Sequence, residues 1–164
     1  MSTYPTVAAA LRTAIAARPN LSAVTVRYGR PRYTEDLQSG NKREAVWIDG
    51  PGTGTKDYPY LTPGSKPTDE TYTLLVAVQV EQGADAATDP DDAQLQADTR
   101  ANALMLEVEA AVAADVTAGV TSVVPLVVSV NGWQRGDPPD ASAESYWCRL
   151  DIEIGVQARI PAPS

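Results

Sequence analysis

Hydrophobic residues recur at helical spacing near the N-terminus. Val7, Leu11 and Ile15 fall on one side of a helix, which we expect over residues 4–18. Thr3 precedes this stretch and is a suitable N-cap, because its hydroxyl can accept a hydrogen bond from the first turn.

A second helix is predicted from the residues that begin it. Asp89 is a suitable N-cap, Pro90 fits the first helical position, and Asp91 and Asp92 favour the positive end of the helix dipole. Apolar residues then recur at helical spacing to about residue 115: Ala97, Ala101, Leu104, Met105, Val108, Ala111 and Val112.

Alternation of apolar and polar residues predicts the strands of a four- or five-stranded sheet. These strands are expected at residues 23–28, 44–49, 70–82, 122–130 and 144–160. In the last strand the apolar face includes Cys148, which we expect to be buried. Trp47 is expected in the core, and Trp133 in a loop over residues 131–143.

This order of elements predicts a two-layer α+β domain over residues 1–160, with a frayed tail at 161–164. The sheet should be mixed but mainly antiparallel, with both helices packed on its apolar face. The two longest strands exceed the usual five or six residues, so we expect them to project beyond the helices. Projecting strands favour contact with a partner subunit.

Residues 50–68 contain four prolines and four glycines, and we interpret them as a long loop. Its opening glycines and lysine superficially resemble a phosphate-binding loop, but Thr55 and Asp57 stand where that motif needs glycine and Ser or Thr. Aromatic side chains in such a loop favour a contact with a partner. The candidate contact residues are Lys56, Tyr58, Tyr60 and Leu61.

Composition removes several classes of mechanism. The chain has no histidine and one cysteine, so histidine general bases, internal disulfides and thiolate zinc sites are excluded. Carboxylate and lysine chemistry remain possible, but the usual catalytic residues are missing. We expect no catalytic residues, no cofactor and no bound metal. The net charge of −8 argues against nucleic-acid binding through a basic surface, and no apolar run is long enough for a membrane helix. We expect a soluble, cytosolic protein.

The polar face of the last strand holds a second group of candidate residues. Asp151 and Glu153 could form a carboxylate pair for acid–base chemistry, but arginines on the same face favour a solvated, partly paired surface. An inter-subunit or lumen-facing role is the other interpretation of this face. Its candidate residues are Trp147, Arg149, Asp151, Glu153 and Arg159, together with Trp133.

The order and texture of these segments resemble the tail terminator (tail completion) proteins of long-tailed bacteriophages over nearly the whole chain. An alanine-rich helix leads into a strand that ends in Tyr-Gly-Arg-Pro at residues 28–31, followed by Val-Trp-Ile at 46–48 and a long loop. A strand opening Glu-Thr-Tyr-Thr-Leu at 70–74, a helix with Val-Glu at 108–109 and a last strand ending Ala-Arg at 158–159 complete the resemblance.

The resemblance implies a two-layer α+β subunit of a hexameric ring that caps the tail tube and ends its polymerisation. It also implies a homo-oligomer that contacts the tail-tube protein and the head–tail connector, while DNA passes through the lumen without specific binding. The protein would be assembled in the host cytoplasm and would lie at the head-proximal end of the virion tail. The alternatives are a head–tail connector or minor tail component and, in a different class, a small-ligand-binding domain.

Overall fold

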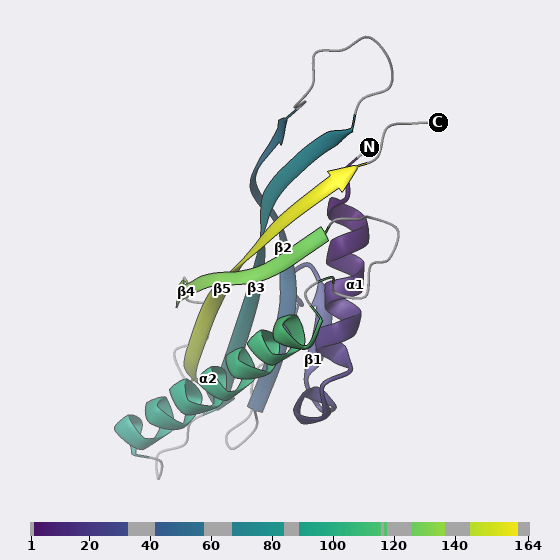
Figure 1. Ribbon diagram of the computed structural model, residues 1–164. Coiled ribbons are helices and arrows are strands. Elements are labelled where there is room, and N and C mark those ends of the chain that lie inside the picture. The colour runs from purple at the N-terminus through teal and green to yellow at the C-terminus, as the bar shows by residue number, and fades with distance from the viewer. Residues whose placement is uncertain are drawn as a thin grey trace.

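The computed structural model describes residues 2–32, 42–57, 67–83, 89–115, 117, 126–136 and 145–160. Its strands form one mixed sheet in the order β1-β2-β3-β5-β4 (Figure 1). β1 runs parallel to β2, and every other neighbouring pair is antiparallel. The predicted α+β class and mainly antiparallel sheet are confirmed. The strands are β1 (Thr25–Tyr28), β2 (Lys42–Asp57), β3 (Thr68–Gly83), β4 (Leu126–Arg135) and β5 (Ser145–Ile160).

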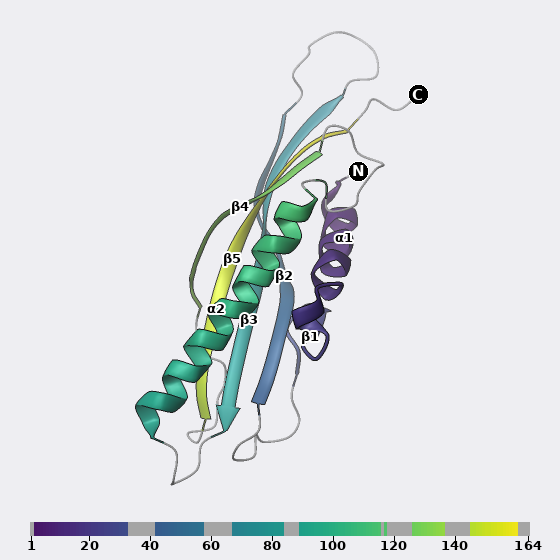
Figure 2. The ribbon, with the colours of Figure 1, turned by 60° about the horizontal axis from the view of Figure 1, so that its bottom comes forward.

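Two helices, α1 (Tyr4–Ala16) and α2 (Pro90–Ala114), cover the same face of this sheet (Figure 2). A short 3-10 helix, η1 (Pro19–Leu21), joins α1 to β1. Asp89 caps α2 as predicted, since its carboxylate accepts a hydrogen bond from the Asp91 N–H at 2.9 Å. Among the described residues, no helix combines the length and hydropathy needed to cross a membrane.

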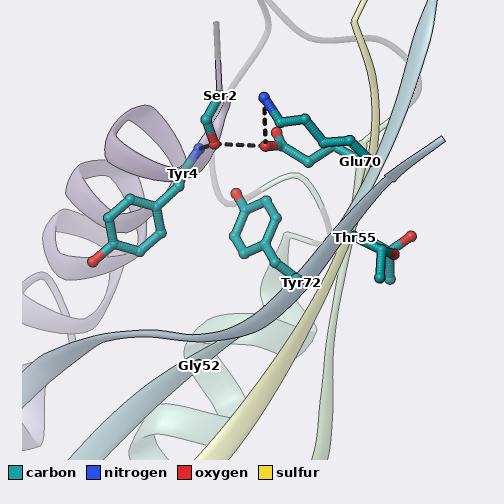
Figure 3. Close-up of a pocket in the computed structure, with 9 residues that line it drawn as sticks. Ser2, Tyr4, Gly52, Thr55, Glu70 and Tyr72 are labelled. Atoms are coloured by element: carbon teal, nitrogen blue, oxygen red, sulfur yellow. Dashed lines mark hydrogen bonds and ion pairs between the residues drawn. The ribbon is translucent and has the colours of Figure 1, made fainter. Parts of the chain in front are cut away.

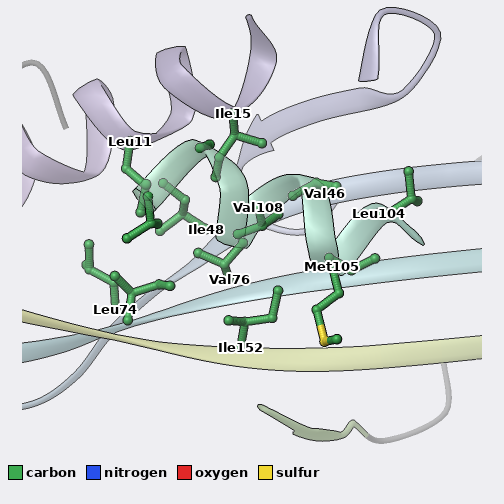
Figure 4. Close-up of a cluster of buried hydrophobic side chains, with 14 of the residues drawn as sticks. Leu11, Ile15, Val46, Ile48, Leu74, Val76, Leu104, Met105, Val108 and Ile152 are labelled. Atoms are coloured by element: carbon green, nitrogen blue, oxygen red, sulfur yellow. The ribbon is translucent and has the colours of Figure 1, made fainter. Parts of the chain in front are cut away.

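The core lies between the helices and the apolar face of the sheet (Figure 4). Leu11 and Ile15 of α1 and Leu104 and Val108 of α2 belong to one cluster that lies over the central strands, and Val76 lies in the middle of β3. All five side chains are buried. Burying each one fully stabilises the fold by about 1.5–3 kcal/mol, so the apolar alternation and the helical stripes together account for the two layers.

The prediction of a loop over residues 50–68 is wrong for residues 50–57, which continue β2 as a strand. The register with β3 shifts twice, between Ile48 and Gly50 and between Pro51 and Gly54. Gly50 has φ of 120°, which favours glycine, and a Cβ at Gly52 would collide with the Thr73 hydroxyl. The glycines therefore let a bulged strand lie against β3 instead of ending it.

Three strands of 16 residues each run the length of the sheet. At the upper end in Figure 2, β2 and β3 extend past both helices. We call residues 50–57 with residues 68–75 the arm. The expected projection beyond the helices is confirmed for β3 and β5, the two strands for which it is predicted, and β2 projects with them (Figure 2). On β2 the side chain of Lys56 and residues 52–55 are exposed.

Trp133 lies in strand β4, which corrects its predicted place in a loop. β4 begins at Leu126 and continues to Arg135 because it bulges between Val130 and Gly132 and then resumes pairing with β5. The bulge interrupts the apolar alternation, so the sequence pattern alone ends the strand too early.

Candidate functional site

The face of the sheet opposite the helices carries most of the candidate residues. We call it the helix-free face. It is formed by alternate residues of the three central strands: Arg43, Ala45, Trp47 and Asp49 of β2, Leu75, Ala77, Gln79 and Glu81 of β3, and Trp147, Arg149, Asp151 and Glu153 of β5.

Trp47 is only 1% exposed although neither helix covers it. Ala45 and Ala77 are also buried and form a small apolar cluster with it. The guanidinium of Arg149 lies over the indole, with its central carbon 5.2 Å from the ring centroid. Trp47 was predicted in the core, and it is buried, but in this separate cluster on the other side of the sheet.

Arg149 also binds two carboxylates. Its Nε donates to Asp151 Oδ1 at 2.7 Å, and its Nη2 donates to Asp49 Oδ2 at 3.2 Å. Asp49 in turn accepts from the Trp47 indole N–H at 3.2 Å. Hydrogen bonds and the arginine–indole contact thus join four side chains into one network over the part of the sheet that no helix covers: Trp47, Asp49, Arg149 and Asp151.

The two ends of β5 repeat this pairing of charges. Arg43 lies 3.7 Å from the carboxylate of Glu81, which also accepts from the Ser145 hydroxyl at 2.9 Å. Arg159 binds Asp69 through two hydrogen bonds, at 2.6 and 2.9 Å. These bonds to Arg159 hold the pKa of Asp69 below its ordinary value.

A hollow of 250 Å³ lies where β4 bulges away from β5. Its lining includes Leu75, Asn131, Trp133, Asp151 and Glu153. Asn131 donates from its amide to Glu153 Oε1 at 3.2 Å. The hollow therefore combines an aromatic ring, an amide and two carboxylates.

The base of the arm holds a second polar site, which we call the latch (Figure 3). Glu70 of β3 accepts hydrogen bonds from the Ser2 hydroxyl at 2.6 Å, the Thr3 N–H at 2.8 Å and the Thr3 hydroxyl at 2.7 Å. Lys56 Nζ lies 3.6 Å from the same carboxylate. Ser2, Lys56, Glu70 and Tyr72 border a hollow of 280 Å³.

The latch corrects the predicted role of Thr3. Its side chain makes no cap hydrogen bond to the first turn of α1. It turns to Glu70, and that carboxylate takes the position at the helix N-terminus where negative charge is favoured. A residue 67 positions away along the chain thus ties α1 to the arm.

Glu70 is buried, which by itself would raise its pKa. The hydrogen bonds from Ser2 and Thr3 and the charge of Lys56 outweigh that effect and lower the pKa below its ordinary value. Tyr72, beside it, has its pKa raised to about 12, mainly by burial. Glu70 is therefore held as a carboxylate and Tyr72 as a neutral phenol.

Most of the predicted face residues come together. Trp147, Arg149, Asp151 and Glu153 share the helix-free face, and Arg135 stacks over the Trp147 ring with its central carbon 5.7 Å from the ring centroid. Arg159 lies on the same side of β5 but at the arm, where it binds Asp69, and Trp133 lies at the sheet edge. Of the predicted contact loop, Lys56 joins the latch, while Tyr58, Tyr60 and Leu61 lie outside the described residues.

The candidate functional residues predicted from the sequence did not include Glu70, Asp49 and Tyr28. Glu70 is in phase with Tyr72 and Leu74 on the apolar face of β3, and a carboxylate at such a position is a signal of a buried ionic contact. No comparable signal marks Asp49, because its partner Arg149 is distant in the sequence.

The described residues offer little for metal or thiol chemistry. In the described part of the chain, no three carboxylate or thiol groups are placed to hold a metal ion. Cys148 is buried as predicted, and burial together with the neighbouring Asp98 raises the pKa of its thiol to about 12. A thiol with this pKa is a packing residue and a poor nucleophile.

Comparison with known proteins gives no match, either among protein-family models or among curated proteins.

Proposed function

We propose that this chain is a structural subunit that assembles into a ring on the end of a phage tail tube. In this role it would stop tube polymerisation and form the interface to the head connector. The observation that carries the proposal is the arm, whose outer end projects past both helices and whose base is fastened to α1 by the latch. The projecting end of the arm supports contact with a neighbouring molecule. The sequence resemblance supports the proposal that this molecule is the tail-tube protein.

The helix-free face supports the same proposal through its charges. Arg43, Arg149 and Arg159 each pair with a carboxylate of this chain, in a protein with a net charge of −8. Arginines engaged in this way bind phosphate weakly, because a phosphate would have to displace the internal partner. Such a face suits a lumen through which DNA passes without being held.

Arrest of tube growth tests the proposal. Purified tail-tube protein would be polymerised with and without a small molar fraction of the chain, and tube lengths would be measured by electron microscopy. A terminator shortens the tubes as its concentration rises. A head–tail connector would leave tube length unchanged and bind only the finished end, so unchanged lengths would reject the terminator assignment.

A small-ligand-binding domain is the second candidate function. The hollow at the β4 bulge favours it, since Trp133 offers an aromatic surface beside the carboxylates of Asp151 and Glu153. This alternative predicts that the chain remains a monomer or dimer in the presence of tubes and that a ligand protects Trp133 from fluorescence quenching.

A further inference from the structure

One register row crosses the whole sheet and has an exposed aromatic residue at each end. It runs from Tyr28 in β1 through Ile48, Val76 and Ile152 to Trp133 in β4. The three inner residues are buried, whereas Tyr28 is 55% exposed and Trp133 is 56% exposed. Exposed aromatic side chains at the edges of a sheet are typical of protein–protein contacts.

Each of the two edge strands has a single partner strand in the part of the chain that the structure describes. Among the described residues, β1 pairs only with β2 and β4 only with β5, so each has an outer edge with backbone groups available to a partner. β4 carries no charged residue before Arg135, and no proline. Charges and prolines are two of the usual protections against edge pairing, so β4, whose protection is the bulge between Val130 and Gly132, is suited to accept another strand along the rest of its edge.

The directions of the edge strands fit a head-to-tail contact. β1 is parallel to β2, and three successive antiparallel pairings lead from β2 to β4. β1 and β4 therefore point in opposite directions. If two copies lie side by side in the same orientation, β4 of one meets β1 of the next as an antiparallel pair.

We infer that neighbouring subunits join by antiparallel pairing of β4 with β1 of the next copy, with Trp133 packed against that copy's Tyr28. This inference rests on the proposed ring and names its subunit contact. The partner is a second copy because the row places the two aromatics at the same level on opposite edges. A heterologous contact between opposite edges closes into a ring when the rotation between successive copies matches that ring. Aromatic pairs across strands are among the favoured contacts between neighbouring strands.

Cysteine cross-linking tests this contact. With Tyr28 opposite Trp133, antiparallel pairing places Arg27 opposite Gln134, and both residues are exposed in the subunit. The double variant Arg27→Cys/Gln134→Cys should give a ladder of cross-linked oligomers with a short bis-maleimide. Each single variant should stay monomeric on denaturing gels, and so should the control Arg27→Cys/Leu95→Cys, whose second site is exposed on α2.

A matched pair of substitutions provides the second measurement. Trp133→Ser should weaken self-association by about tenfold or more, as expected for a central aromatic contact. Leu95→Ser removes an apolar side chain that is 64% exposed, slightly more than Trp133, and should leave association unchanged. Circular dichroism would confirm that both variants fold.

The outcomes separate this inference from the proposed function. Rings or tube caps that form without the cross-link ladder, or that survive Trp133→Ser, would overturn the β4–β1 contact and leave the ring proposal standing. Dimers of the single variant Gln134→Cys would indicate a twofold β4–β4 contact and would also overturn the inference. A chain that stays monomeric both alone and on tubes would overturn the two together.

Discussion

Arg149 covers Trp47 on the side of the sheet that has no helix, with the guanidinium carbon 5.2 Å from the ring centroid. The same guanidinium binds Asp49 and Asp151. A single arginine thus lies over a buried indole and binds two carboxylates at once.

Replacing Arg149 by alanine should lower the free energy of unfolding by about 2–3 kcal/mol, since it exposes Trp47 and leaves two carboxylates without their partner. Urea unfolding followed by tryptophan fluorescence measures this change. Arg159→Ala is the matched control, because Arg159 and Asp69 form an ion pair whose side chains are 44% and 36% exposed. The control should cost less than about 1 kcal/mol. Equal losses for the two variants would show that the contact of Arg149 with Trp47 stabilises the fold no more than an exposed ion pair does.

The contribution of the latch to the free energy of unfolding should depend on pH. The pKa of Glu70 is lower in the folded protein than in the unfolded chain, so its contribution is present above the ordinary carboxyl range and is lost as the pH falls through the folded pKa. At neutral pH, Glu70→Gln should cost about 1–3 kcal/mol.

The pH dependence separates the latch from a simple packing effect. The difference in unfolding free energy between the wild-type protein and Glu70→Gln should shrink below about pH 4. Hydrogen exchange should rise in the first turn of α1 in the variant, because the amide oxygen of glutamine is a weaker acceptor for the Thr3 N–H than the carboxylate is. A difference that stays constant from neutral to acidic pH would contradict an ionised latch.

Cys148 should be unreactive in the folded protein. Its thiol is buried, and its pKa of about 12 leaves almost no thiolate at pH 8. A thiol reagent such as dithionitrobenzoate should react slowly with the native chain and promptly in denaturant. Native reaction as fast as that of the unfolded chain would show that the last strand opens readily at this position.

The tyrosines that follow the arm should serve binding more than folding. Tyr58→Ala/Tyr60→Ala is predicted to weaken attachment to tail tubes in co-sedimentation while the melting temperature stays near that of the wild-type protein. Tyr72→Ala is a useful contrast, because Tyr72 is buried at the base of the arm and packs edge-on against Tyr4 with ring centroids 6.0 Å apart. A large loss of stability in the double variant would mean that these tyrosines belong to the core.

Elements with local signals could be predicted from the sequence. α2 begins where Asp89 and Pro90 indicate, because a cap and a first-turn proline act within a few residues. The two faces of β5 follow its alternation without interruption, since its register with β3 has no shift. Cys148 is buried for the same reason.

Features that depend on distant partners could not be predicted in this way. Residues 50–57 have the composition of a loop, and only their pairing with β3, which tolerates two bulges, makes them a strand. The contact of Glu70 with Ser2 and Thr3, and that of Arg149 with Trp47, join residues far apart in the chain. Their geometry follows from the order of strands in the sheet, which periodicity does not determine.

Negative-stain electron microscopy of the purified chain, alone at high concentration and mixed with tail tubes, tests the central claim most directly. The account predicts sixfold rings, or caps at one end of the tubes. A monomer that caps tubes would still agree with it, because the tube would then template the ring. A chain that stays monomeric and leaves tube ends bare would contradict it.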